Sequence, residues 1–175
     1  YGGAIMAKTG IIFAINGPIV KTSNDSGFEM HEMVYVGEEN LVGEVIGLTS
    51  DATVIEVYEE TGGIKPGEIV TGTGAPVSVT LAPGILNNIF DGIERPLSEI
   101  AKVDGTYISR GVSVDSLDTK KLWKTHITVK PGQAIDGGTI IAEVPETPAI
   151  LHRVMLSPNL KGYVLDVVED GEYTI

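Results

Sequence analysis

The chain has 175 residues, no cysteine, and 24 acidic against 12 basic side chains, which gives a formal net charge of −12 at neutral pH. Without cysteine, a disulfide-stapled secreted module, thiolate catalysis and a cysteine-ligated metal site are excluded. The acidic excess argues against nucleic acid as a partner, because affinity for nucleic acid depends on Lys and Arg neutralising phosphates. No stretch approaches the roughly 20 apolar residues that span a bilayer, so we expect no direct membrane insertion and a cytoplasmic location.

Glycine and proline punctuate the chain, with 22 and 9 residues, and they separate short runs rich in Val, Ile and Thr. This pattern is typical of an all-β sandwich or barrel and predicts a mostly β fold. Residues 1–5 precede Met6, and we interpret them as a remnant of an expression tag that takes no part in the fold. The native start is expected at Met6.

The first half of the chain predicts a small closed barrel. Strands are expected at residues 11–15, 19–20, 32–36, 41–48 and 52–58, and Asn16-Gly17-Pro18 interrupts the first two. Turn residues at 37–40 and 49–51 separate the later strands, and a spacing of about ten residues suits a small barrel. In residues 53–58 both faces carry apolar side chains, so the alternation leaves open which face is buried.

The pattern changes after Pro83-Gly84. Residues 85–90 place apolar side chains at i, i+1, i+4 and i+5, which predicts a short helix ending at residues 91–92. A second short helix is expected with Ser98 as its N-cap and Glu99 in its first turn. Strands return at residues 126–130, 139–144, 151–156 and 162–168, which predicts a second β module.

Residues 64–72 and 129–137 follow the same pattern, each with Lys-Pro-Gly followed by apolar residues. Proline sets φ for the first central position of a type II turn and glycine supplies the positive φ of the second, so each run predicts a turn that enters a strand. The match is short, and reuse of one turn solution explains it at least as well as duplication does.

The sequence predicts no catalytic, cofactor-binding or metal-binding residue. His31, His126 and His152 lie far apart without a metal-ligand spacing, which favours histidines held by local hydrogen bonds. Residues 72–77 begin like a dinucleotide loop but lack the third glycine and contain Pro76, so we interpret them as a plain loop. No Lys follows a Gly, which excludes a P-loop, and no Gly-x-Ser-x-Gly occurs.

Two acidic pairs and one tryptophan have structural interpretations. The pairs at 38–39 and 59–60 adjoin turn residues, and adjacent residues in a strand point to opposite faces, so they are interpreted as solvated charge. Trp123 is expected to be an anchor beneath the second module. From the residues alone, the chain is an acidic, mostly β protein of two modules with an interaction or assembly role.

Several runs together resemble the catalytic A subunit of the rotary V-type/A-type ATPases. These runs are residues 16–20 (NGPIV), 42–46 (VGEVI), 57–63 (VYEETGG), 66–68 (PGE), 81–84 (LAPG), 89–97 (IFDGIERPL), 110–112 (RGV), 138–147 (GTIIAEVPET) and 171–174 (GEYT). They follow the family's order from Met6 onward. The segment from about residue 110 favours the A subunit, because the related F-type subunits and the non-catalytic B subunit lack this insertion.

The resemblance implies a six-stranded barrel over residues 6–75, a connection into an absent nucleotide-binding domain over 76–109, and an inserted bulge module over 110–175. It implies that the P-loop and the catalytic glutamate lie beyond Ile175, so ATP and Mg²⁺ belong to the parent subunit and no cofactor to this fragment. The implied partners are the B subunits of the A3B3 hexamer for the barrel and peripheral-stalk subunits for the bulge, which we expect to fold independently.

Two alternatives come from other classes of protein. Residues 129–168 also resemble the barrel of biotinyl or lipoyl carrier domains, with Lys161 as the nearest candidate for covalent attachment. Lys161 lacks the Met or Asp neighbours of those carriers, which favours a solvated turn lysine. The other alternative is a stand-alone β-barrel adaptor.

Overall fold

The computed structural model describes residues 8–86, 88–105 and 108–175. The proposed tag remnant at residues 1–5, and Met6, lie outside the described residues. The chain divides into two compact units. Unit 1 comprises the described residues up to Val79 together with Asp104–Ser113, and unit 2 comprises Thr80–Val103 and Val114–Ile175. The prediction of a mostly β fold is confirmed.

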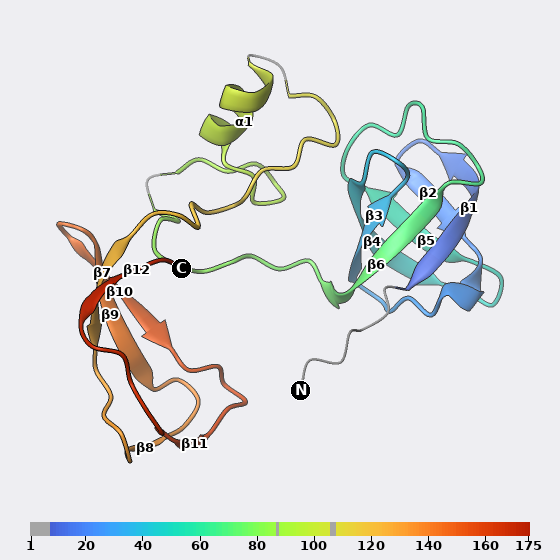
Figure 1. Cartoon of the computed structure of the whole chain (residues 1–175). Helices are drawn as coiled ribbons and strands as arrows, with labels where there is room; N and C mark the ends of the chain where they lie inside the picture. Colours follow the sequence, from blue (N-terminus) through green and yellow to red (C-terminus); the bar gives the residue numbers. More distant parts are fainter. Residues whose placement is uncertain (1–7, 87, 106–107) are drawn as a thin grey trace. The chain divides into compact units, whose positions relative to one another are not determined.

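Unit 1 contains a closed, antiparallel β-barrel of six strands (Figure 1). The strands are β1 (Thr9–Asn16), β2 (Ile19–Thr22), β3 (Glu32–Val36), β4 (Leu41–Leu48), β5 (Thr53–Val57) and β6 (Ile69–Pro76). They follow the order β1-β2-β5-β4-β3-β6 around the wall, and β6 closes it by pairing with both β1 and β3. A 3-10 helix, Asn24–Ser26, lies between β2 and β3.

Alternate residues of these strands fill the barrel interior. The ten buried core residues are Ile12, Val20, Phe28, Val34, Val36, Leu41, Val45, Ile55, Val57 and Val70. Burying one such aliphatic side chain contributes about 1.5–3 kcal/mol. In β5, Ile55 and Val57 point inward and Glu56 points outward, which settles the face that the alternation had left open.

The interpretation of residues 72–77 as a plain loop is wrong, because β6 continues to Pro76. Gly72 pairs with Val34 of β3, and Pro76 pairs with Glu32 at the end of the ladder. A Cβ on Gly72 would overlap Glu32 Oε1 and lie 2.9 Å from the Phe28 ring. Glycine is therefore needed here for close packing inside a strand, and loop-like composition hides the strand that closes the barrel.

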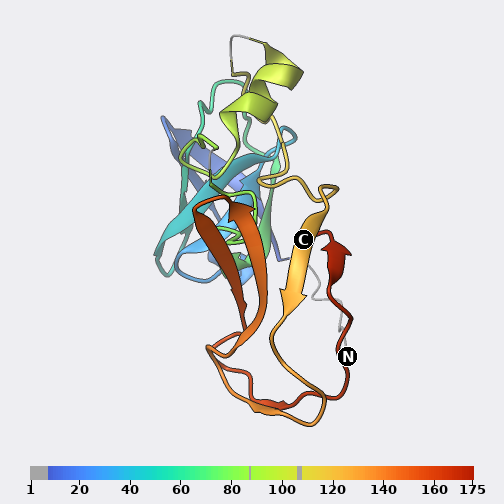
Figure 2. The ribbon, with the colours of Figure 1, turned by 90° about the vertical axis from the view of Figure 1, so that its left-hand side faces the viewer.

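Unit 2 contains a four-stranded antiparallel sheet and a two-stranded ribbon. The sheet follows the order β10-β9-β7-β12, with β7 (Trp123–Ile127), β9 (Ile140–Thr147), β10 (Ile150–Met155) and β12 (Gly171–Tyr173), and Figure 2 shows the β9–β10 hairpin beside β7 and β12. The ribbon pairs β8 (Ala134–Ile135) with β11 (Gly162–Tyr163). The predicted strand at 162–168 is therefore shorter than expected, and β12 was not predicted.

The predicted helix at residues 85–90 is wrong, because its described residues adopt turns and extended backbone. Gly84 has a φ of 108°, and the Glu146 carboxylate accepts hydrogen bonds from the N–H groups of Gly84 and Leu86 at 2.8 and 3.0 Å. Ile89 is 73% exposed. The N–H groups bound by Glu146 hold the start of the segment in another conformation.

The second predicted helix is confirmed as α1 (Leu97–Asp104), with Glu99 in its first turn. The Pro96 carbonyl accepts hydrogen bonds from the N–H groups of Glu99 and Ile100 at 3.0 and 3.1 Å. Pro96 therefore occupies the N-cap position that Ser98 was expected to hold.

No helix among the described residues is long and apolar enough to cross a membrane.

The two Lys-Pro-Gly runs form the same turn. Glu68 N–H donates to the Lys65 carbonyl at 3.2 Å and Gln133 N–H donates to the Lys130 carbonyl at 3.1 Å. Gly67 and Gly132 have φ values of 100° and 81°. Side-chain oxygens of Glu68 and Gln133 also accept from the N–H groups of Lys65 and Lys130. Each turn leads into a strand, β6 or β8, as predicted.

Candidate interaction surfaces

The three histidines lie in separate places, each beside its own carboxylate. The Nδ1 atom of His31 lies 2.7 Å from Glu44, that of His126 2.5 Å from Asp170, and that of His152 3.6 Å from Glu146. The Ile127 N–H and the His126 ring both bind Asp170, and these hydrogen bonds lower the pKa of its carboxyl. Within the described ranges, no group of three or more His, Cys, Asp or Glu side chains could hold a metal ion.

On the outer wall of the barrel, Glu44 of β4 accepts hydrogen bonds from Tyr58 and His31. Both hydrogen bonds lower the pKa of Glu44, and the bond from Tyr58 has the larger effect. The same carboxylate raises the pKa of Tyr58 to about 12, because ionising the phenol would remove the shared proton and leave two adjacent negative charges. The two hydrogen bonds tie the start of β3 and the end of β5 to Glu44 of β4 on the outer wall.

Two of the acidic residues interpreted as solvated charge bind a distant segment of the same unit. The Arg110 guanidinium binds the Glu39 carboxylate through two N···O contacts of 2.7 Å. Glu59 accepts a hydrogen bond of 2.9 Å from the Gly111 N–H. We call Glu39, Glu59, Gly63, Arg110 and Gly111 the Arg110 clasp. It holds the chain that follows α1 against the turns between the barrel strands.

Two glycines make room for the clasp. A Cβ on Gly63 would lie 2.9 Å from Arg110 Nη2, and a Cβ on Gly111 would lie 2.7 Å from the Glu39 carbonyl oxygen. Both glycines have positive φ, 101° and 70°. The sequence signal for this feature was the Arg110-Gly111 pair itself, but its partners lie 71 and 52 positions away.

The outer wall of the barrel carries two groups of exposed apolar side chains. Face 1 comprises Ile11 and Phe13 of β1 and Ile69 of β6, and Ile11 pairs directly with Ile69. Face 2 comprises Met30, Ile46 and Leu48, at β4 and just before β3. Single exposed apolar residues are common on protein surfaces, whereas grouped ones on adjoining segments indicate contact sites.

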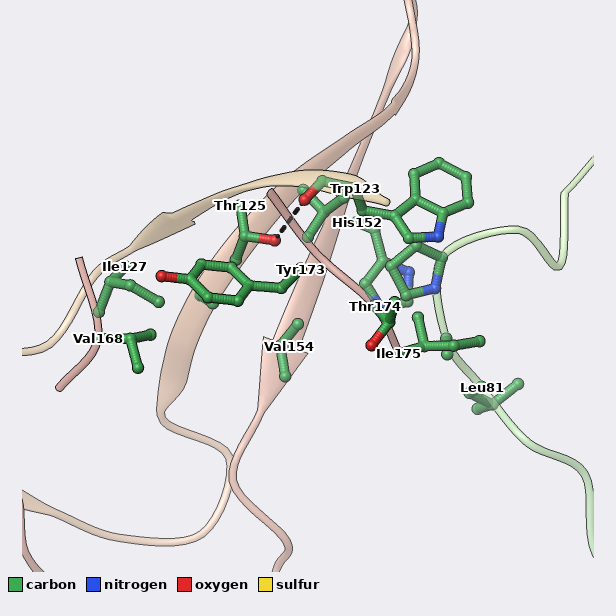
Figure 3. A pocket seen from close by; sticks show the side chains of 14 residues that line it. Leu81, Trp123, Thr125, Ile127, His152, Val154, Val168, Tyr173, Thr174 and Ile175 are labelled. Carbon is green, nitrogen blue, oxygen red and sulfur yellow. Dashed lines mark hydrogen bonds between the residues drawn. The ribbon is translucent and has the colours of Figure 1, made fainter. Parts of the chain in front are cut away.

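Unit 2 has an apolar cavity of about 360 Å³ against its four-stranded sheet (Figure 3). Its lining includes Trp123, Ile127, Val154 and Tyr173, and His152, Thr125 and Thr174 contribute polar groups. Among the residues that the structure describes, neither Lys nor Arg lines this cavity.

Trp123 forms one wall of this cavity and is buried, as expected of an anchor. Lys121 Nζ lies 3.9 Å from the centroid of its ring. A Cβ on Gly84 would lie 3.2 Å from Cζ2 of the indole. The buried Glu146 binds Gly84 and Leu86, so the segment around residues 81–86 packs against the sheet and completes the cavity wall. Lys161 lies outside this cavity, between a turn and β11.

Comparison with known proteins finds relatives of both units. The family model of the ATP synthase alpha/beta family, beta-barrel domain, matches residues 12–74, and that of the ATPsynthase alpha/beta subunit barrel-sandwich domain matches residues 114–175. The chain is 50% identical over 170 residues to the V-type ATP synthase alpha chain of Halothermothrix orenii, covering 97% of this chain and 29% of the relative.

Archaeal relatives give the same result. The A-type ATP synthase A subunit of Methanosphaera stadtmanae is 46% identical over 167 residues, covering 95% of this chain and 28% of the relative. That of Pyrococcus abyssi is 46% identical over 170 residues, covering 97% of this chain and 17% of the relative. The chain therefore spans less than a third of the length of these relatives. It belongs to the ATP synthase alpha/beta family, with that family's β-barrel domain followed by its barrel-sandwich domain, and is homologous to the N-terminal portion of the V/A-type A subunit.

Proposed function

We propose that this chain is the N-terminal assembly portion of the catalytic A subunit of an ion-translocating V/A-type ATPase or ATP synthase, which couples ATP hydrolysis or synthesis to H⁺ or Na⁺ transport. The observation that carries the proposal is the 50% identity to a V-type ATP synthase alpha chain over 170 residues, spanning both the barrel and the sandwich. A relative that shared only the barrel would not support the A subunit in this way.

The chain supplies contacts and not chemistry. No Lys follows a Gly anywhere in it, so it has no P-loop to cradle a phosphate. ATP and Mg²⁺ are bound by the remainder of the parent subunit. The complex sits at the cytoplasmic side of a membrane, to which this subunit is peripheral.

Each unit has its own partners in this proposal. The barrel packs beside barrels of B subunits in the A3B3 hexamer, and the exposed apolar groups on its outer wall support this role because a closed barrel has no free strand edges to pair. The sandwich of unit 2 contacts peripheral-stalk subunits. Neither role uses a reacting side chain.

The proposal is tested by extending the chain along its natural gene and mixing the product with the B subunit. We expect the extended chain to hydrolyse ATP when it is mixed with the B subunit, whereas the 175-residue chain in the same mixture should not. A natural reading frame that stops soon after Ile175, or an extended chain that forms no complex with the B subunit, would contradict the proposal in favour of a stand-alone adaptor.

The carrier-domain alternative has no specific observation in its favour, since both family models belong to ATP synthases. Intact mass after incubation with a biotin or lipoate ligase distinguishes the two possibilities. We expect no mass increase, and modification at Lys161 would support the carrier instead.

A further inference from the structure

The chain passes between its two units three times. Unit 2 consists of residues 80–103 and 114–175, whereas residues 104–113, which lie between these segments in the sequence, belong to unit 1 with the barrel. The passages therefore follow residues 79, 103 and 113. If residues 104–113 left the barrel, only the passage after residue 79 would still connect the units. The number of connections that restrain unit 2 thus depends on what holds residues 104–113 on the barrel.

The Arg110 clasp holds this segment on the barrel. The guanidinium of Arg110 makes a bidentate contact with the Glu39 carboxylate, and the Gly111 N–H donates to the Glu59 carboxylate. Bidentate contacts fix the orientation of the guanidinium as well as its position. The side chains of Arg110 and Glu39 are 34% and 48% exposed. Water therefore reaches both partners, so separating them leaves neither charge buried and unpaired.

The barrel turns that receive the clasp are held by bonds of their own. The Glu68 carboxylate accepts hydrogen bonds from the N–H groups of Glu38 and Lys65 at 3.1 and 2.8 Å. These two bonds join the turn after β3 to the turn before β6, and they use no residue of the segment 104–113. Opening the clasp would therefore leave its binding place on the barrel formed.

The segment also has an internal contact. The Asp104 carboxylate accepts hydrogen bonds from the N–H and hydroxyl groups of Ser109. This contact lies within residues 104–113 and does not depend on the barrel. Proteins open locally in such contiguous pieces, at free energies below that of global unfolding. The segment can therefore leave the barrel as one piece while the barrel stays folded.

We propose that the Arg110 clasp is a releasable strap that sets how freely unit 2 moves relative to the barrel. When the strap is closed, residues 104–113 are part of the barrel unit, and three passages of the chain restrain unit 2. When it is open, the same residues form a loop attached at both ends to unit 2, and the passage after residue 79 is the remaining covalent connection. This device goes beyond the assembly role above and does not depend on it.

The test measures the distribution of distances between the two units in the 175-residue chain. The chain contains no cysteine, so Asp51→Cys in unit 1 and Lys161→Cys in unit 2, both at exposed positions, carry two spin labels for double electron–electron resonance. The strap variant, Arg110→Gln/Gly111→Ala, is made in this labelled chain. It removes the ion pair and places a methyl group against the Glu39 carbonyl oxygen.

The matched control is Gly17→Ala/Arg153→Gln in the same labelled chain. It makes the same two kinds of change, but no atom lies within 4 Å of the position that a Cβ on Gly17 would take, and Arg153 pairs with Glu143 in the sheet of unit 2. We expect a broader distance distribution in the strap variant than in the wild type, because fewer connections restrain unit 2. The control should keep the width of the wild type.

Amide hydrogen exchange on the same variants reports whether the strap opens by itself. In the strap variant, residues 108–113 should exchange faster than in the wild type while β3 and β4 stay protected. An unchanged distance distribution in the strap variant, or equal broadening in the control, would overturn the proposal. Loss of protection in β3 and β4 would also overturn it, because the clasp would then be part of the barrel fold and not a separate strap.

Discussion

At the scale of single residues, the Arg110 clasp depends on the absence of two β-carbons. Its guanidinium and the Gly111 N–H bind two carboxylates on separate turns of the barrel. Exposed ion pairs contribute about 0–1 kcal/mol each, and Arg110 and Glu39 are both partly exposed. The steric fit at Gly111 therefore matters more to the stability of this region than the charge pair does.

Replacing Gly111 by Ala should destabilise unit 1. The new methyl group would meet the Glu39 carbonyl oxygen at 2.7 Å, and a backbone carbonyl has little freedom to move away. We expect a loss of about 1–3 kcal/mol from this overlap, in addition to about 1–2 kcal/mol for alanine in the left-handed region. Urea unfolding, followed by circular dichroism, measures the difference.

The matched control is Gly17→Ala. Gly17 also has a positive φ, 58°, but no atom lies within 4 Å of the position that a Cβ would take. This variant should therefore lose only the stability that alanine costs in the left-handed region, without any steric overlap. Equal destabilisation of the two variants would mean that the chain at residues 110–111 does not press on the Glu39 turn.

Tyr58 should ionise at unusually high pH. Its hydrogen bond to Glu44 raises its pKa to about 12. The absorbance at 295 nm is followed against pH for the wild type and for Tyr58→Phe, and the difference between the two curves isolates the titration of Tyr58 from that of the other tyrosines. Glu44→Gln should return the pKa of Tyr58 towards the ordinary value of about 10. A Tyr58 that titrates near 10 in the wild type would mean that the bond to Glu44 is not maintained in solution.

The same pair predicts the direction of two pH effects on stability. The folded pKa of Tyr58 is above its unfolded value, so its contribution is fully present below about pH 10 and is lost as the pH rises towards 12. The folded pKa of Glu44 is lowered, so its contribution is present above its ordinary pKa and is lost as the pH falls through the lowered value.

At the scale of elements, β6 is the strand that closes the barrel and the one whose composition resembles a loop. Gly72 packs against Glu32 Oε1 and the Phe28 ring with no space for a methyl group. Glu32 is itself buried and accepts hydrogen bonds from the N–H groups of Glu29 and Gly74. The buried carboxylate and the glycine strand therefore form one packed unit.

We expect Gly72→Ala to destabilise the barrel by about 1–3 kcal/mol, because the added carbon displaces Glu32 or Phe28 from a filled interior. Thermal unfolding measured by calorimetry checks the loss. Thr71→Ala, one residue earlier on the outward side of the same strand, is the control and should change stability by about 0.5 kcal/mol or less. A near-neutral Gly72→Ala would show that the space beside residue 72 can relax.

At the scale of the whole molecule, unit 2 is discontinuous in sequence. Residues 80–103 belong to it together with residues 114–175. Gly84 and Leu86 donate to the buried Glu146, and Gly84 packs on Trp123. The sheet of unit 2 thus packs together with a segment that we expected to form a connection.

A chain comprising residues 80–175 should give a dispersed amide spectrum and unfold cooperatively. A chain comprising residues 110–175 should unfold at lower denaturant concentration, since removal of residues 80–103 leaves the Glu146 carboxylate without its N–H partners and exposes Trp123. Equal unfolding midpoints for the two chains would mean that the sandwich is stable without that segment.

Features that depend on neighbouring residues could be predicted from local patterns in the sequence. Alternation and turn chemistry located β3 and β4 at their observed bounds, and the two Lys-Pro-Gly turns precede strands as predicted. The family was also recognisable, because its short motifs recur in order along the chain. Turns and strand alternation are set within a few residues, so the sequence carries them directly.

Features that join distant parts of the chain could not be predicted from the sequence and became visible in the three-dimensional structure. These are the inward face of β5, the strand at Gly72, the non-helical backbone at residues 85–90 and the partners of Arg110. Gly84 and Glu146 are 62 positions apart, and Arg110 and Glu39 are 71 apart. A local pattern cannot encode which carboxylate meets which donor, because barrel closure and sheet packing bring together residues that are far apart in the sequence.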